Sequence, residues 1–244
     1  MSIVSVKMKS AWYGAISAVS FTDSYIEKVI KIYDYSLSQG SKQIHSTDIQ
    51  DYICGRNGSG RSDIRSTISL LGKMGFAKSA NDSFTGDSFF NATGHIFALA
   101  LKSRARCDDE QLLSKLDALI ARLICIGISN AIENKESGSG NMLILLKLFS
   151  HFGNISWDEY LYTLYLYYSG NQTSSFDELF QKIEENRSLQ VEYRILKDTD
   201  EDTPVDGTAY LYNQKLLEQS GTIEKISPRE AQLKNRTLII MAKI

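Results

Sequence analysis

Three glycines within six residues interrupt two helical sequence patterns in the first third of the chain. Gly55, Gly58 and Gly60 favour turn geometry and left-handed backbone angles, so neither flanking helix can continue through them. Ser46 can cap a helix before the break, because a serine side chain accepts a hydrogen bond from an otherwise unpaired amide. The sequence therefore predicts a helix, a tight turn and a second helix between residues 46 and 71.

The second of these helices has two chemically different faces. Ile64, Ile68 and Leu71 recur at the spacing of one buried helical face. The other face combines long cations with small hydroxyls, which suits a helix that enters the DNA major groove and contacts base edges. It carries Arg61, Ser62, Arg65, Ser66 and Ser69, of which the first four are expected at bases, while Arg56, Lys73 and Lys78 are expected at phosphates or at a neighbouring hairpin.

A hairpin is predicted directly after this helix. Segments 76–78 and 88–90 flank a polar turn, residues 79–87, which contains Asn81, Asp82 and a glycine. The chain then enters a helix opened by Thr93 and Gly94. Segment 43–97 thus resembles the winged-helix family in its order of elements. The resemblance implies binding of double-stranded DNA, or protein contact alone, since winged helices do both.

Composition limits the class of protein. A chain of 244 residues with 43% hydrophobic content can form one large or two ordinary domains. The net charge of -2 means that DNA binding must come from a local basic face. The three scattered cysteines, Cys54, Cys107 and Cys125, predict neither a disulfide framework nor a zinc site and indicate a reducing, cytoplasmic location. No stretch reaches the ~18 apolar residues of a membrane span, and we expect no membrane association.

Three further segments of the first half have alternative interpretations. Lys102, Arg104 and Arg106 can contact phosphates or can be the solvated end of a helix. Residues 108–134 form one amphipathic pattern, which predicts a connecting helix or a dimer seam. Trp12 and Tyr13 are expected to pack as a lid on the first domain rather than to stack on bases.

The second half repeats the elements of the first. Capping-box patterns at residues 156–159 and 175–178 open two helices. Segments 189–196 and 209–212 are predicted as strands of a second wing, and 237–241 as a terminal strand. The helix 175–188 is rich in carboxylates that repel phosphates, so the second domain is expected to support the first or to bind protein.

We therefore predict a mainly α protein with small β wings, an α+β class in which tandem winged-helix domains are joined by a long helix. The expected boundaries are 1–107 for the N-terminal winged-helix domain, 108–135 for the connecting helix and 136–244 for the second domain, with a flexible linker at 136–140.

Tandem winged helices in a chain that ends on an apolar strand resemble the DNA-recognition regions of type II restriction endonucleases, in particular the type IIS enzymes. No catalytic residue can be assigned from this resemblance. No cofactor is expected in this chain, and Mg²⁺ only if a nuclease domain is present. The acids between residues 192 and 202, including Asp200, with Lys197, have the residue types of a metal-dependent nuclease, but a solvated loop is the preferred interpretation.

Three functions remain open. The chain can be a module that recognises a sequence in double-stranded DNA, either as part of a restriction endonuclease or as a regulator of transcription or replication without catalytic activity. It can be a tandem winged-helix interaction protein, similar to the accessory subunits of chromosome-condensing ATPases, with a homodimer or protein partner bound through the second domain. It can also be a complete nuclease that uses the acids at 192–202.

Overall fold

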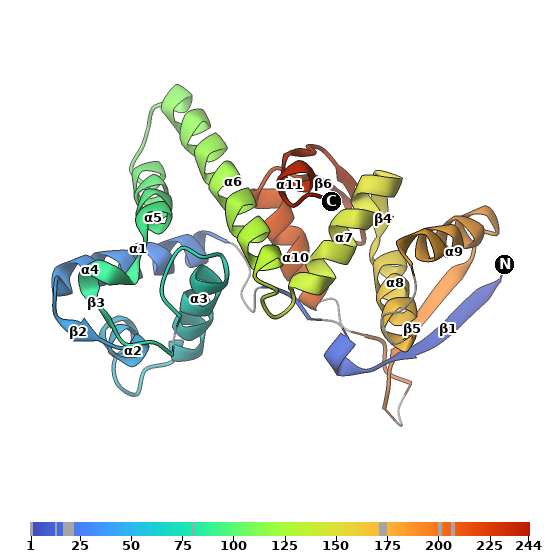
Figure 1. Cartoon of the computed structure of the whole chain (residues 1–244), viewed down its shortest axis with the longest axis horizontal. Helices are drawn as coiled ribbons and strands as arrows, with labels where there is room; N and C mark the ends of the chain where they lie inside the picture. The colour runs from blue at the N-terminus through green and yellow to red at the C-terminus, as the bar shows by residue number, and fades with distance from the viewer. Residues whose placement is uncertain are drawn as a thin grey trace.

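The described part of the chain is mainly helical and carries three small sheets, which confirms the expected α+β class. The computed structural model describes residues 2–12, 14–16, 22–79, 81–170, 175–199, 202–205 and 208–244. Residues 23–104 form a first unit and residues 139–241 a second unit, and a long helix lies between them in Figure 1. Buried hydrophobic side chains of both units belong to one connected core.

The first unit consists of helices around a short strand pair. Its elements are α1 (Asp23–Gln39), β2 (Gln43–Ile44), α2 (Ser46–Cys54), α3 (Arg61–Lys73), β3 (Phe84–Thr85), α4 (Gly86–Phe89) and α5 (Ala92–Arg104). Strands β2 and β3 pair antiparallel. The predicted apolar face of α3 is buried, since Ile64, Ile68 and Leu71 are all at most 1% exposed.

The turn between α2 and α3 has the glycine geometry that the sequence predicts. A side chain at Gly58 would place its Cβ 1.5 Å from the backbone oxygen of Cys54, so only glycine fits there. The start of α2 differs by one residue from the prediction. His45 is the N-cap, because its amide donates to the Asp48 carboxylate at 2.7 Å, and Ser46 is already helical and buried.

The predicted hairpin after α3 is wrong in its second strand. Residues 86–89 form the short helix α4, and the hairpin reduces to one bridge between Ala77 and Phe90. The Thr85 amide donates to the Ser88 hydroxyl at 3.0 Å, which opens the helix. Burial of Phe89 in the core explains why a helical turn replaces the strand. A Cβ at position 86 would lie 2.2 Å from the Ser36 oxygen of α1, so glycine is needed for this approach.

The long helix predicted over 108–134 is confirmed as α6 (Glu110–Glu133). Its fully buried residues all lie from Ile120 onward, although the apolar pattern begins at Leu112. The N-terminal half runs beside α5 and projects from the molecule, whereas the C-terminal half packs between the two units (Figure 1). The segment expected to be a linker is a tight turn, in which Gly138 packs against the backbone of Ala15.

The second unit contains a three-stranded antiparallel sheet. Its elements are α7 (Ser139–Phe152), β4 (Asn154–Ser156), α8 (Trp157–Ser169), α9 (Phe176–Ser188), β5 (Glu192–Lys197), α10 (Thr208–Gln219), β6 (Ile223–Ser227), β7 (Glu230–Leu233) and α11 (Thr237–Met241). The strand order in the sheet is β4-β7-β6. Both predicted capping boxes are present, at Ser156 with Glu159 and at Ser175 with Glu178.

The strands expected for a second wing are only partly as predicted. Segment 189–196 contains strand β5, but residues 209–212 belong to helix α10, and the hairpin of this unit is formed by β6 and β7. The expected terminal strand is helix α11. In α10 the buried residues Tyr210, Asn213 and Leu217 recur at helical spacing, so tertiary burial decides between two patterns that are ambiguous in short apolar segments.

The N-terminal strand β1 (Ile3–Met8) pairs in parallel with β5 of the second unit, from Ile3 beside Glu192 to Met8 beside Lys197. It is followed by the short 3-10 helix η1 (Ser10–Trp12). Trp12 stacks on Tyr168 of α8 with 6.1 Å between ring centroids, so it covers the second unit and not the first. The predicted partner in this lid, Tyr13, is outside the described residues. Strand β1, which the sequence assigned to the expected N-terminal domain 1–107, thus pairs with a strand of the second unit.

None of the helices in the described part of the chain is both long and apolar enough to cross a membrane.

Candidate nucleic-acid interface

The solvent-facing side of α3 carries the residues that the sequence places there. Ser62 and Arg65 are exposed, and Ser66 and Ser69 are half-buried. No ion pair joins the Arg65 guanidinium to any residue that the structure describes. This side of α3 therefore presents one free cation among three small hydroxyls.

Arg65 lies between two hollows on the surface of the first unit. The first is lined by α2 and its N-cap, with His45, Thr47 and Gln50, and by Asp82 in the loop after α3. The second is lined by residues Ser69, Gly72, Lys73, Ser79 and Glu136. Asn81 borders both hollows. The start of α2, the outer side of α3 and the loop 79–82 thus form one recessed polar surface around Arg65.

The other arginine predicted to contact bases has a structural partner. The Arg61 guanidinium forms an ion pair with Asp51 of α2 and donates to the backbone oxygens of Gly55 at 3.3 Å and Arg56 at 3.1 Å. These contacts tie α3 to α2 across the glycine turn. In this arrangement, Arg61 positions the helix, and Arg65 is the arginine that faces solvent.

Lys73 lies where the two units meet. Its ammonium group donates to the backbone oxygens of Ile16 at 2.9 Å and Ser137 at 3.1 Å. Burial lowers the pKa of Lys73, while the nearby Glu136 carboxylate acts in the opposite direction. Because of these bonds, the Lys73 ammonium group lies at the junction of the two units and is not available to a phosphate.

Arg56 and Lys78 are exposed and lie beyond the two ends of α3. Neither has an ion pair with a described residue. Two of the nearby acids are already engaged, since Asp63 pairs with Lys28 at 3.0 Å and Asp82 accepts from the Ser79 amide at 3.2 Å. Of the predicted cations, the structure thus leaves Arg56, Arg65 and Lys78 available to a ligand.

The basic run at the end of α5 is mostly neutralised within the chain. Lys102 pairs with Asp34 at 2.5 Å, and Arg104 pairs with Asp117 of α6. Arg106 is exposed in the loop that follows. Two of these three cations therefore connect helices.

The second unit exposes a different chemistry on α10, the helix that precedes its hairpin. Leu211 is 47% exposed, and Ile226 on β6 is 51% exposed. A groove along α10 is lined by Leu211, Tyr212, Gln214, Lys215 and Glu218, with Lys225 of β6. Lys215 is paired with Glu218 at 3.0 Å, and most of the accessible area in the groove is apolar. Sequence analysis missed this surface because it expected strand at 209–212.

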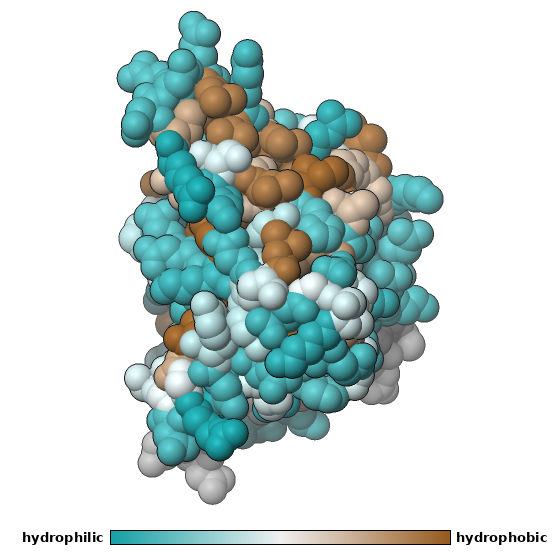
Figure 2. Space-filling model, turned by 90° about the vertical axis from the view of Figure 1, so that its left-hand side faces the viewer, coloured by the Kyte–Doolittle hydropathy of each residue, from teal (hydrophilic) through white to brown (hydrophobic). Residues whose placement is uncertain are grey.

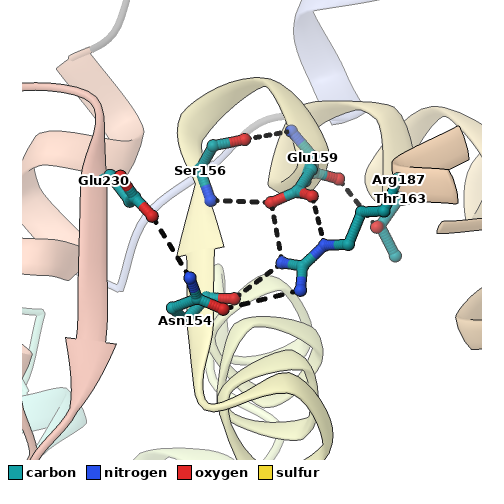
Figure 3. Close-up of polar contacts among 6 residues, drawn as sticks. All are labelled: Asn154, Ser156, Glu159, Thr163, Arg187 and Glu230. Atoms are coloured by element: carbon teal, nitrogen blue, oxygen red, sulfur yellow. Dashed lines mark hydrogen bonds and ion pairs between the residues drawn. The ribbon is translucent and has the colours of Figure 1, made fainter. Parts of the chain in front are cut away.

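Helix α9, the carboxylate-rich helix of the second unit, is fastened to α8 and β4 (Figure 3). Arg187 donates to both carboxylate oxygens of Glu159 at 2.6 and 3.0 Å and to the backbone oxygen of Asn154 at 2.8 Å. Glu159 is only 8% exposed and also accepts from the Ser156 amide at 2.9 Å. Helix α9 thus supports the unit, consistent with its acidic outer side.

The acids at 192–202 are separated in the part of the chain that the structure describes. Asp202 pairs with Lys7 at 3.8 Å and with Arg194 at 3.6 Å. Asp200 and Glu201 are outside the described residues. Among those that are described, no three His, Cys, Asp or Glu side chains are grouped so that they could hold a metal ion.

No protein-family model matches the chain, and no curated protein and no solved structure has significant similarity to it.

Proposed function

We propose that the chain binds double-stranded DNA in a sequence-dependent way through the outer side of α3. The observation that carries the proposal is the position of Arg65, a solvent-facing arginine without an ion pair among the described residues, set between α2 and the loop 79–82. An arginine at such a site can donate two hydrogen bonds to a guanine edge in the major groove.

The order of elements supports a tandem winged-helix arrangement. In the first unit, α1, β2, α2 and α3 precede the loop and β3. In the second unit, α7, β4 and α8 precede α10 and the β6–β7 hairpin, with α9 and β5 inserted between α8 and α10. Strand β4 then pairs with β7, just as β2 pairs with β3 in the first unit. Helices α3 and α10 thus occupy corresponding positions.

In this binding mode, α3 lies in the major groove with Ser62, Arg65 and Ser66 toward base edges. The flanking cations Arg56 and Lys78 contact phosphates at the two ends of the helix, and these contacts set its position without reading sequence. Asp51 and Arg61 hold the angle between α2 and α3. A local cluster of three cations is compatible with the net charge of -2, because only the contact surface must be basic.

The first experiment is an anisotropy titration of the full chain with a random-sequence duplex pool at two salt concentrations, followed by selection and sequencing of the bound DNA. We expect an enriched motif and an affinity that falls steeply with salt, because phosphate contacts release counterions. Absence of binding at low salt would refute the proposal. A short fixed motif, bound without cleavage when Mg²⁺ is added, is the behaviour expected of the recognition part of a restriction endonuclease.

A second candidate function is protein contact through the second unit. The observation that favours it is the largely apolar groove along α10, with Leu211 and Tyr212 where α3 carries arginine and serine. Under this alternative, the chain is an interaction subunit, and substitution of Leu211 by Asp abolishes assembly with a purified partner while any DNA affinity is unchanged.

A further inference from the structure

The projecting hairpin of α5 and α6 has an apolar outer face. Ile96 and Leu99 of α5 are each 50% exposed, and Leu112 and Leu119 of α6 are 49% and 39% exposed. Leu113 and Leu116 of α6 are partly exposed between them. Figure 2 shows hydrophobic residues gathered in the upper part of this side of the molecule, below a polar tip. Exposed large apolar side chains that cluster in this way indicate an interaction surface.

Helical geometry places the exposed apolar residues of each helix along one side of that helix. Leu112, Leu116 and Leu119 recur at intervals of four and three residues, and Ile96 and Leu99 are three apart, so each set forms a stripe along its helix. The opposite side of α5 is covered by the first unit, where Phe97 and Leu101 are fully buried. Arg104 and Asp117 pair across the two helices, beside a hollow lined by Leu101 and Ile120. The stripe is the side that the rest of the described chain leaves uncovered.

The charges along the exposed part of α6 are self-complementary in an antiparallel arrangement. The acids Asp108, Asp109 and Glu110 lie at the N-terminal end of α6, where carboxylates suit a helix N-terminus. The exposed Arg122 lies on the other side of the leucine stripe, beyond Leu119. A twofold axis near Lys115 and Leu116 sets Leu112 beside Leu119 of another copy. It also brings Asp108 next to Arg122 of that copy. Parallel pairing would instead place acids beside acids.

We propose that two copies of this chain associate through the outer faces of their α5–α6 hairpins, with the α6 helices antiparallel. Such a contact is isologous, because the same surface serves both partners and closes the assembly at a dimer. The leucine stripes form its apolar centre and the Asp108–Arg122 pairs its rim, the usual arrangement of a protein interface. This inference does not rest on DNA binding.

Sedimentation equilibrium of the full chain tests the proposal. We expect a monomer–dimer equilibrium with a dissociation constant below about 100 µM, equivalent to roughly -5.5 kcal/mol. The double variant Leu112→Glu and Leu119→Glu is expected to weaken association at least tenfold, because it buries carboxylates at the centre of the contact. Ile240→Glu is the matched control, since Ile240 is 73% exposed on α11 and outside the hairpin.

Two results would overturn the proposal: a wild-type chain that is monomeric at about 100 µM, or a dimer that the double variant leaves unchanged. If the wild type is monomeric, the exposed leucines would instead be a contact surface for a different protein. Circular dichroism of each variant establishes that it is folded. A charge exchange then tests the orientation. Asp108→Arg and Arg122→Asp should each weaken the dimer, and their combination should restore it, whereas no restoration would exclude the antiparallel arrangement.

Discussion

Helices α3 and α10 each lie in sequence between two strands that pair with each other, β2 with β3 and β4 with β7, but they expose different chemistry. The outer side of α3 presents Arg65 among serines, whereas α10 presents Leu211 and Tyr212 beside a lysine that is already paired. The order of elements is therefore not enough to assign a function to either unit. The side chains that a helix exposes after folding decide whether it suits nucleic acid or protein.

The units also differ in how the helix before the hairpin is held. In the first unit, α3 follows α2 directly and is fixed by the glycine turn and the Arg61–Asp51 pair. In the second unit, α9 and β5 intervene, and an ion pair between the buried Glu159 and the half-buried Arg187 fastens the insertion. The two units thus hold the helix before their paired strands by different contacts.

The largest expected effect is a loss of stability when Arg187, which bonds α9 to α8 and β4, is replaced. Arg187→Ala removes the charged partner of Glu159, and we expect the free energy of unfolding to fall by about 2–3 kcal/mol, less than for a fully buried pair because the Arg187 side chain is 32% exposed. Urea denaturation followed by the fluorescence of Trp157, which is 6% exposed, measures this loss. Arg236→Ala is the matched control on an exposed arginine, and equal stability of the two variants would contradict the assigned role.

The next effect concerns the proposed DNA contact. Arg65→Ala should weaken binding to the selected motif by about 1–3 kcal/mol and reduce the preference for the motif over a scrambled duplex. Lys225→Ala, which removes an exposed cation of the second unit, should leave both unchanged. If the lysine variant were the one that lost affinity, the second unit and not the first would be the DNA-binding unit.

Alkaline pH should lower the stability of the second unit more than that of the first, because burial raises the pKa values of more tyrosines in the second unit. Burial raises the pKa of Tyr193 from 10.0 to about 12, and it also raises the pKa values of Tyr160 and Tyr210 in the same unit. Below pH 10, folded and unfolded chains both keep these protons, so stability is complete. Above pH 10, the unfolded chain releases protons that the folded chain retains, and the free energy of unfolding falls as pH rises toward 12.

We therefore expect Trp157 fluorescence to report unfolding of the second unit at high pH, with a smaller loss of stability in Tyr193→Phe. Amide exchange in α3 measures the first unit, where burial raises the pKa of Tyr25. If both units unfolded at the same pH, their shared core would make them one cooperative unit. The expected difference in stability between the two units would then be wrong.

The smallest effect is expected from one phosphate contact. Lys78→Ala should weaken binding almost equally for target and scrambled duplex and should reduce the slope of log affinity against log salt by about 1, since one fewer counterion is released. Lys73→Ala should leave that slope unchanged, because the Lys73 ammonium group is bonded to backbone oxygens at the junction of the units. A reduced slope for Lys73→Ala together with an unchanged slope for Lys78→Ala would show that the junction between the units opens on binding.

Local sequence patterns were sufficient for the glycine turn, for α3 with its two faces, for α6 and for both capping boxes. In each of these cases, the signal is carried by neighbouring residues: a backbone angle, a cap three residues away or apolar side chains at helical spacing. The same reasoning failed for 209–212 and 237–241, where short apolar segments satisfy both strand and helix patterns, and for Ser88 and Phe89, which belong to a short helix and not to a strand.

The sequence alone determined which residues stand on the outer side of α3, because helix periodicity assigns every side chain to a face. Only the tertiary structure decided which of them remain available. Arg61 meets Asp51, and Lys73 meets the backbone at Ile16, through contacts between segments that periodicity does not relate. The position of β1 on the second unit is of the same kind, since pairing with β5 joins residues far apart in the chain. A local pattern specifies the direction of a side chain along its element, and the partner that it meets depends on how distant elements pack.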